Sequence, residues 1–238
     1  MPFTDTIPAR LAARVRSAGS APLLTYYDTR TGERVELSAI SFANWVDKTS
    51  NLLSTLGVED GFVAGPVSVE HPGHWVSLIW PLAAWQHGCG YAAVERSQAV
   101  DADVAVIGPE AVAPVVPGAT IACSLHALAL PFSVLPVGVL DYTREVLGEP
   151  DAHWAASVDA GRMAWVDRDR ELTHAALAGL PPVPDRVLVR PTTAWDTLSA
   201  ALLRPLLGGG SAVVVSGDIT PDALARLAES ERVTAGVS

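Results

Sequence analysis

Residues 163–177 read MAWVDRDRELTHAAL and place a strand-like run directly before the start of a helix. The apolar run Met163–Val166 predicts a buried strand, and residues 173–177 predict the first turn of a helix. Such a junction is a frequent position for a phosphate-binding loop, in which glycines let consecutive backbone N–H groups face an anion. The junction here, residues 167–171, has no glycine and no lysine but has three carboxylates. We therefore expect a short solvent-exposed turn without a nest of backbone amides.

The composition is that of a folded protein with a full hydrophobic core. The chain has 238 residues, 49% of them hydrophobic, which is enough for one large domain or two small ones. It carries 26 acidic against 16 basic residues, a formal charge of −10. Because no basic stripe is available to neutralise phosphates, neither nucleic acid nor an anionic membrane is an expected partner.

Cysteine usage and the N-terminal sequence predict a cytoplasmic protein. Cys89 and Cys123 lie far apart in apolar, strand-like segments, which favours buried reduced thiols over a disulfide or a metal site. The first residues contain no apolar signal-like core, and no window approaches the roughly 18 apolar residues of a membrane span.

The first half of the chain alternates strands and helices. A short amphipathic helix is expected at 7–17, and a polar turn between runs 23–27 and 34–37 predicts a hairpin. The next helix is expected between Ser38, which can cap it, and Gly57, which can end it.

Residues 66–94 predict a strand, helix, strand crossover. We expect a strand at 66–70, a nearly all-apolar and therefore buried helix at 74–86, and a return strand at 89–94. Pro81 should kink the helix. Further strands are expected at 103–107 and 120–124.

A linker is predicted at 146–160, where Gly, Pro, Asp and Ala are frequent and no period is sustained. It would separate a first subdomain, 1–145, from a smaller second one, 161–238. In the second subdomain, strands are expected at 163–166, 186–190 and 212–215 and from Val233 onward; helices are expected at 173–177, at 194–207 and from Pro221 to about Ser230. This alternation predicts an α/β fold with parallel-rich sheets layered with helices.

Three motifs could carry chemistry, but each favours a structural interpretation. The glycines at 208–210 follow a helix, so they predict its C-terminal cap rather than a phosphate loop. His71 and His74 could approach one metal ion, but no Cys, Asp or His joins them at ligand spacing, which favours a solvated turn. His174 could be catalytic, although packing at a helix start is favoured. No catalytic residue and no metal ligand is therefore expected.

Several segments together resemble the large N-terminal domain of the adenylate-forming (AMP-binding) superfamily, which contains acyl-CoA synthetases, peptide-synthetase adenylation domains and luciferases. ERVELSAISFANWVDKTSNLLSTLGVEDG resembles the first helix of that domain, and VSVEHPGHWVSLIWPLAAWQHGCGYAAV resembles the crossover that follows. ELTHAAL, AWDTLSAALLRPLLGGGSAVVV and PDALARLAESERVTAGVS resemble its later elements. The resemblance implies two subdomains of an incomplete acyl-CoA synthetase-like domain.

The departures from the superfamily pattern bear on function. Its Ser/Thr/Gly-rich phosphate loop should lie just before Leu172, where residues 167–171 stand instead. Residues 192–195, Thr-Thr-Ala-Trp, occupy the place of a frequent aromatic-His pair. The superfamily's tyrosine-glycine-threonine-glutamate segment, ribose-binding aspartate and C-terminal domain with its catalytic lysine have no counterpart in this sequence.

The favoured interpretation is a degenerate, non-adenylating acyl-CoA synthetase-like protein without a cofactor. It would bind a small acyl or nucleotide-like ligand, or a protein partner. A ligand should lie beyond the carboxyl ends of the strands, and the candidate pocket residues are Thr192, Thr193, Trp195, Ser216, Asp218 and His174.

Two alternatives stay open. One is an active AMP-forming synthetase or ligase fragment that uses ATP and Mg²⁺ and is completed by another chain. The other is a structural module that forms a homo-oligomer through a sheet edge or uncovered helices.

Overall fold

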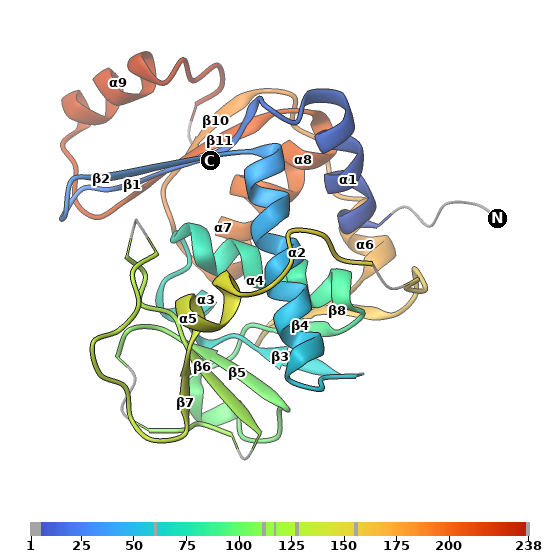
Figure 1. Ribbon diagram of the computed structural model, residues 1–238. Helices are drawn as coiled ribbons and strands as arrows, with labels where there is room; N and C mark the ends of the chain where they lie inside the picture. Colours follow the sequence, from blue (N-terminus) through green and yellow to red (C-terminus); the bar gives the residue numbers. More distant parts are fainter. Residues whose placement is uncertain are drawn as a thin grey trace.

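The strands of the chain form two sheets, seen in the computed structural model that describes residues 6–59, 61–110, 113–116, 118–126, 129–154 and 157–236 (Figure 1). The smaller sheet has the order β10-β11-β1-β2. Its strands are β1 (Pro22–Asp28), β2 (Glu33–Ser38), β10 (Arg186–Val189) and β11 (Ser211–Ser216). Strands β10, β11 and β1 run parallel, and β2 returns antiparallel to β1 as the predicted hairpin.

The larger sheet has the order β7-β6-β5-β3-β4-β8-β9. Its strands are β3 (Phe62–Ala64), β4 (Gly90–Ala92), β5 (Val104–Ile107), β6 (Ala119–Ala122), β7 (Val139–Asp141), β8 (Met163–Val166) and β9 (Glu171–Thr173). The strands from β7 to β8 are parallel to their neighbours, and β9 pairs antiparallel with β8. The parallel-rich α/β architecture predicted from the sequence is confirmed.

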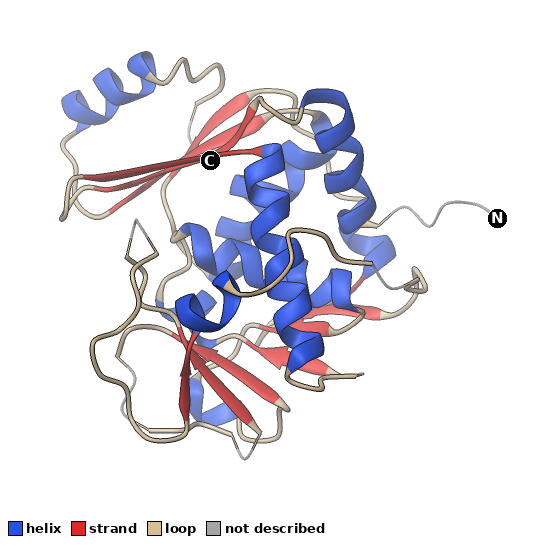
Figure 2. Ribbon diagram, in the orientation of Figure 1, coloured by secondary structure: helices blue, strands red, loops and turns tan. Residues whose placement is uncertain are grey.

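Helices fill the space between the two sheets, and the C-terminal helix lies on the outer face of the smaller sheet (Figure 2). The helices are α1 (Ile7–Ala18), α2 (Ala39–Thr55), α3 (Pro66–Glu70), α4 (Trp75–His87), η1 (Arg96–Gln98), α5 (Tyr142–Leu147), α6 (His174–Ala178), α7 (Ala194–Leu198), the π turn Ser199–Leu203, α8 (Arg204–Gly208) and α9 (Pro221–Ser230). Along β11, Val213 and Val215 pack with α9, whereas Ala212 and Val214 belong to the central core. Both faces of this strand are covered, as its uninterrupted apolar run predicts.

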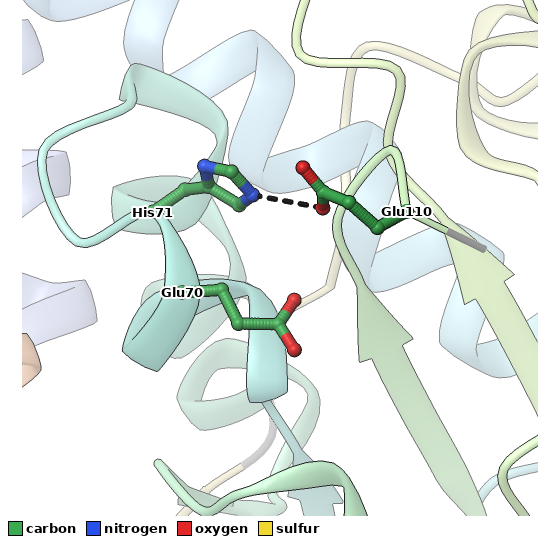
Figure 3. A group of neighbouring side chains, drawn as sticks. All are labelled: Glu70, His71 and Glu110. Atoms are coloured by element: carbon green, nitrogen blue, oxygen red, sulfur yellow. Dashed lines mark hydrogen bonds and ion pairs between the residues drawn. The ribbon is translucent and has the colours of Figure 1, made fainter.

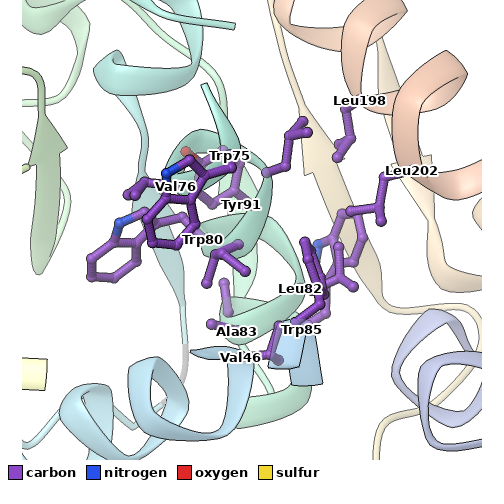
Figure 4. Close-up of a cluster of buried hydrophobic side chains, with 14 of the residues drawn as sticks. Val46, Trp75, Val76, Trp80, Leu82, Ala83, Trp85, Tyr91, Leu198 and Leu202 are labelled. Carbon is purple, nitrogen blue, oxygen red and sulfur yellow. The ribbon is translucent and has the colours of Figure 1, made fainter. Parts of the chain in front are cut away.

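Helix α4 lies at the centre of the core (Figure 4). Every residue from Trp75 to Gln86 is buried, and the neighbouring α2, α7 and π turn contribute Val46, Leu198 and Leu202. The indole N–H of Trp85 donates to the Ala164 carbonyl at 2.6 Å, which fixes the helix against β8. The all-apolar sequence of α4 predicted this burial.

Pro81 leaves one carbonyl of α4 without its helical partner, and a side chain from α3 replaces it. An α-helix would pair the Ser77 carbonyl with the N–H of residue 81, which proline lacks. The Ser68 hydroxyl donates to this carbonyl at 3.2 Å and lies 2.7 Å from the Tyr91 hydroxyl. Gly65 makes room for the pair, because a Cβ there would come within 1.8 Å of the Tyr91 oxygen.

The expected strand at 66–70 is wrong, because this segment is helix α3 and the strand β3 ends at Ala64. Pro66 stands at the first helical position, where its missing N–H costs nothing, and it follows Gly65. Val67 and Ser68 are then buried from a helix rather than from a strand.

The long helix expected at 194–207 contains a wide turn. The Arg204 N–H donates to the carbonyl of Ser199, five residues earlier, and Pro205 follows directly. Because proline has no N–H, the α pattern is interrupted next to it. Two elements that the sequence did not predict, β7 and α5, lie between 131 and 150.

Both sheets contain strands from either side of the predicted linker at 146–160. The hairpin β1-β2 pairs with β11 in one sheet, and β8-β9 pairs with β4 in the other. The linker therefore does not separate the two sheets, and the division into subdomains 1–145 and 161–238 stays a prediction.

Two further expectations concern the cysteines and the end of the chain. Cys89 and Cys123 are buried and neither is part of a disulfide, as expected. The strand expected from Val233 is reduced, in the described residues, to one parallel bridge between Val187 and Ala235. No helix of the described part of the chain has the length and apolar character needed to cross a bilayer.

We expect Ser68→Ala to lower the free energy of unfolding by about 1–3 kcal/mol, because the Ser77 carbonyl would stay buried without a donor. Urea unfolding measures the loss. The control is Ser17→Ala, which removes an exposed hydroxyl bonded within α1 and should change stability by less than about 0.5 kcal/mol. Equal effects of the two substitutions would contradict the role given to Ser68.

Candidate functional site

The six candidate pocket residues do not share one pocket. Thr193 and Trp195 line a cavity of 580 Å³ beside residues 167–170, which we call the turn cavity. Ser216 lines a second cavity of 570 Å³, the acidic cavity, and His174 lines a third of 450 Å³, the His174 cavity. Among the described residues, Thr192 and Asp218 line none of the three.

The turn cavity lies beyond the carboxyl ends of β4 and β8. Its walls come from the residues after these strands, from α3, from the segment around η1 and from the start of α7; they are Val69, Ala93, Val94, Glu95, Ser97, Gln98, Asp167, Arg168, Asp169, Arg170, Thr193, Ala194 and Trp195. This is the place at which the sequence lacks a phosphate-binding loop.

Asp167 takes up the hydrogen-bond donors of the turn. Its carboxylate accepts from the Trp165 indole at 2.8 Å, from the Asp169 backbone N–H at 2.8 Å and from the Arg170 guanidinium at 3.3 Å. The Asp167 N–H donates to the Arg170 carbonyl at 2.9 Å, which closes the turn between β8 and β9. These donors therefore bind a carboxylate of the protein itself, at the place where they would otherwise bind an external anion.

The turn agrees only in part with the expected solvent-exposed loop. Arg168 and Asp169 are exposed, but the side chain of Asp167 is only 12% accessible. The chain also forms β9 before α6 instead of passing straight into a helix. The sequence did not predict β9, because this strand forms only by antiparallel pairing with β8.

Trp195 from the first turn of α7 and Arg170 from the turn both line the turn cavity. The Thr193 hydroxyl accepts from the Asp196 N–H at 3.1 Å and caps α7, which fixes Trp195 in the first turn. The Arg170 guanidinium lies 5.8 Å from the centre of the Trp195 ring, a cation–π contact worth about 0.5–1 kcal/mol when exposed. Thr193 therefore forms the N-terminal cap of α7.

The acidic cavity lies beyond the carboxyl ends of strands from both sheets. Asp28 and Ser216 end β1 and β11, and Pro109 and Ser124 follow β5 and β6. Its lining holds four carboxylates, Asp28, Glu33, Glu70 and Glu110, against one guanidinium, Arg30. The local charge therefore disfavours a phosphate and favours a cation.

His74 is buried in the wall of the acidic cavity, so the expectation of a solvated turn is wrong for this residue, which is 6% exposed. Burial lowers the pKa of His74 to about 3, with a smaller effect from His71, and the Leu125 backbone opposes the change. Its Nδ1 accepts the Val76 N–H at 3.2 Å, so the neutral ring carries its proton on Nε2. That nitrogen has no hydrogen-bond partner of normal geometry among the described residues.

His71 meets two carboxylates that sequence spacing did not reveal. Its Nε2 lies 3.1 Å from Glu110 Oε2, and Glu70 lies beside both. Glu110 follows β5, which is the neighbour of β3 in the sheet although it is distant in sequence. The meeting of these residues could have been predicted only from the strand order, because neighbouring parallel strands such as β3 and β5 have their carboxyl ends at the same edge of the sheet.

His174 lies inside the core rather than at a reactive surface. It is 1% exposed and packs edge-on against Trp85, with ring centres 6.3 Å apart. Neither ring nitrogen has a hydrogen-bond partner within the described ranges. Burial and the charge of Arg162 lower its pKa. The ring is therefore held neutral, in agreement with a packing role.

Comparison with known proteins gives one curated relative and a structural match. No protein-family model matches the chain. A protein of Mycobacterium tuberculosis (strain ATCC 25618 / H37Rv), described as a TIGR03089 family protein, is 36% identical over 246 residues, which are 95% of each chain. A solved acyl-CoA synthetase of Brucella canis matches with a TM-score of 0.76 at 18% identity and covers 97% of this chain. The match covers 46% of that enzyme, so this chain spans less than half of its length.

We expect His174→Leu to flatten the dependence of stability on pH. The lowered pKa means that the unfolded chain, with a His pKa near 6.5, binds a proton that the folded protein excludes. Wild-type stability should therefore fall as the pH drops below about 6.5, by at most about 1.4 kcal/mol per pH unit from this residue.

The measurement is urea unfolding of both proteins at pH 7 and pH 5. The contributions of the other titrating groups cancel in the difference between the two proteins. A variant that loses as much stability as the wild type on acidification would show that His174 is not held neutral.

Proposed function

The chain belongs to the TIGR03089 family and has an acyl-CoA synthetase-like N-terminal fold, and from this premise we propose that it binds a small acyl ligand without adenylating it. The observation that supports the proposal is that the Asp167 carboxylate accepts hydrogen bonds from three donors at the turn between β8 and β9 and at the end of β8. The turn cavity beside it is the proposed ligand site.

Adenylation depends on donors and cations that hold a triphosphate in place. Asp167 engages three donors at this turn, and Glu95 and Asp169 add negative charge to the cavity, whose cations are Arg168 and Arg170. Like unit charges about 4 Å apart repel by about 1 kcal/mol in water and by about 4 kcal/mol near a protein surface. A triphosphate carries several such charges, so its binding here is disfavoured.

A small acyl group suits the turn cavity better than a nucleotide. Its 580 Å³ lies in the range of small-molecule sites. Val69, Val94 and Trp195 supply apolar surface for a short chain. Arg168, exposed at the turn, supplies one positive charge for a single carboxylate.

We expect MgATP to give no saturable heat in isothermal titration calorimetry with the full chain. Because triphosphate binding is disfavoured, pyrophosphate should also not exchange into ATP in the presence of short-chain carboxylates. Measurable exchange would contradict the proposal and would favour the alternative of an active synthetase fragment.

We expect hexanoate to bind the full chain and Trp195→Leu to weaken that binding by at least about tenfold, or about 1.4 kcal/mol. Trp195 lines the turn cavity, and its loss removes apolar contact. The matched control is Trp154→Leu, because Trp154 is 97% exposed and lies outside the three cavities.

Calorimetry measures both variants without depending on tryptophan emission. Equal losses in the two variants, or no hexanoate binding by the wild type, would place the ligand elsewhere.

A further inference from the structure

We propose that Glu70, His71 and Glu110 form a binding site for a divalent zinc ion at the acidic cavity (Figure 3). The site is separate from the turn cavity, so this inference does not depend on the acyl ligand. It rests on the geometry of the three side chains, on the groups that fix them and on the charge of the cavity that they line.

The three side chains converge from two segments of the larger sheet's carboxyl edge. Glu70 ends α3, His71 follows it directly, and Glu110 lies in the loop after β5. One ligand atom from each lies within 4.8 Å of the other two. This set supplies one imidazole nitrogen and two carboxylate oxygens, and three protein ligands with an open fourth position are typical of accessible zinc sites.

Arg96 holds the Glu70 carboxylate and the backbone of Glu110 in position. Its guanidinium donates to the two oxygens of Glu70 at 2.5 and 2.7 Å and to the backbone carbonyl of Glu110 at 2.8 Å. A carboxylate has about four lone-pair positions, so Glu70 keeps acceptor capacity for an ion. Such outer hydrogen bonds orient the ligands of many metal sites.

Gly108 leaves the space that the imidazole occupies. A Cβ at this position would come within 2.7 Å of the His71 ring and 3.0 Å of Glu110 Oε2. The glycine therefore allows the ring and the carboxylate to meet. The present 3.1 Å contact between His71 Nε2 and Glu110 holds the two ligand atoms side by side.

The cavity around the three residues favours a cation with a further ligand. Four carboxylates line it, against the guanidinium groups of Arg30 in the lining and of Arg96 next to Glu70 and Glu110, which leaves an excess of negative charge for a divalent ion. His74, 6% exposed, lines the same cavity, and its Nε2–H has no acceptor of normal geometry among the described residues.

The imidazole ligand selects the class of metal. Zinc accepts mixed nitrogen and carboxylate ligands, whereas magnesium and calcium prefer sites made of oxygen alone. We therefore assign the site to zinc rather than to magnesium.

The test is calorimetric titration of the full chain with zinc chloride. We expect one saturable site and no comparable binding of magnesium chloride. His71→Ala should weaken zinc binding by at least about tenfold, the lower limit seen when even outer partners of ligands are removed. Glu110→Gln changes an exposed side chain at constant size, so it keeps the test valid should His71→Ala fail to fold.

A second histidine pair supplies the matched control. His87 and His153 lie with ring centres 5.9 Å apart, so His153→Ala removes a competing imidazole. This variant should bind zinc as the wild type does. Nitrogen NMR should show the zinc-dependent shift on Nε2 of His71.

Three results would overturn the assignment: no zinc binding by the wild type, unchanged affinity in His71→Ala and Glu110→Gln, or loss of binding in His153→Ala. Failure of hexanoate to bind would leave the zinc result intact, because the two ligands use different cavities.

Discussion

The complete burial of α4 is the constraint on which the rest of the structure depends. A helix that is apolar on all sides must be covered on all sides, and neither sheet alone can do this. The four-stranded sheet, the seven-stranded sheet and the flanking helices enclose it together. Strands from both ends of the chain are needed for this cover, since β1 pairs with β11 and β4 pairs with β8. The two halves of the sequence are therefore interleaved around one core.

This arrangement also decides where chemistry can occur. Because parallel strands of both sheets end at the acidic cavity, polar residues that are distant in sequence meet there. The charges of these residues then limit the ligands. Four carboxylates in the acidic cavity favour a cation, and Asp167 in the neighbouring turn replaces the anion that its donors could have bound. In the proposed function, both features act against the binding of a triphosphate, although the fold is shared with an acyl-CoA synthetase.

Local sequence patterns predicted the features that depend on local physics. The burial of α4 and the apolar strand β11 both follow from neighbouring residues. The errors arise where distant pairing decides the outcome. Residues 66–70 are apolar enough for a strand, but Pro66 starts a helix instead. The meeting of His71 with Glu110 and the pairing of β8 with β9 required knowledge of strand order. The six candidate pocket residues do not share one cavity because strand order, which the sequence did not reveal, decides which strand ends meet.

One helix connects the central core to both cavities. Val69 lines the turn cavity and the next residue, Glu70, lines the acidic cavity, so α3 forms a wall of each. The position of α3 is set by Ser68, which bonds the carbonyl that Pro81 leaves free in α4. A proline in the most buried helix therefore has an effect beyond a local interruption. The carbonyl that it leaves unpaired needs a buried donor, that donor fixes α3, and α3 in turn fixes one ligand of the proposed zinc site and one apolar contact of the proposed acyl site.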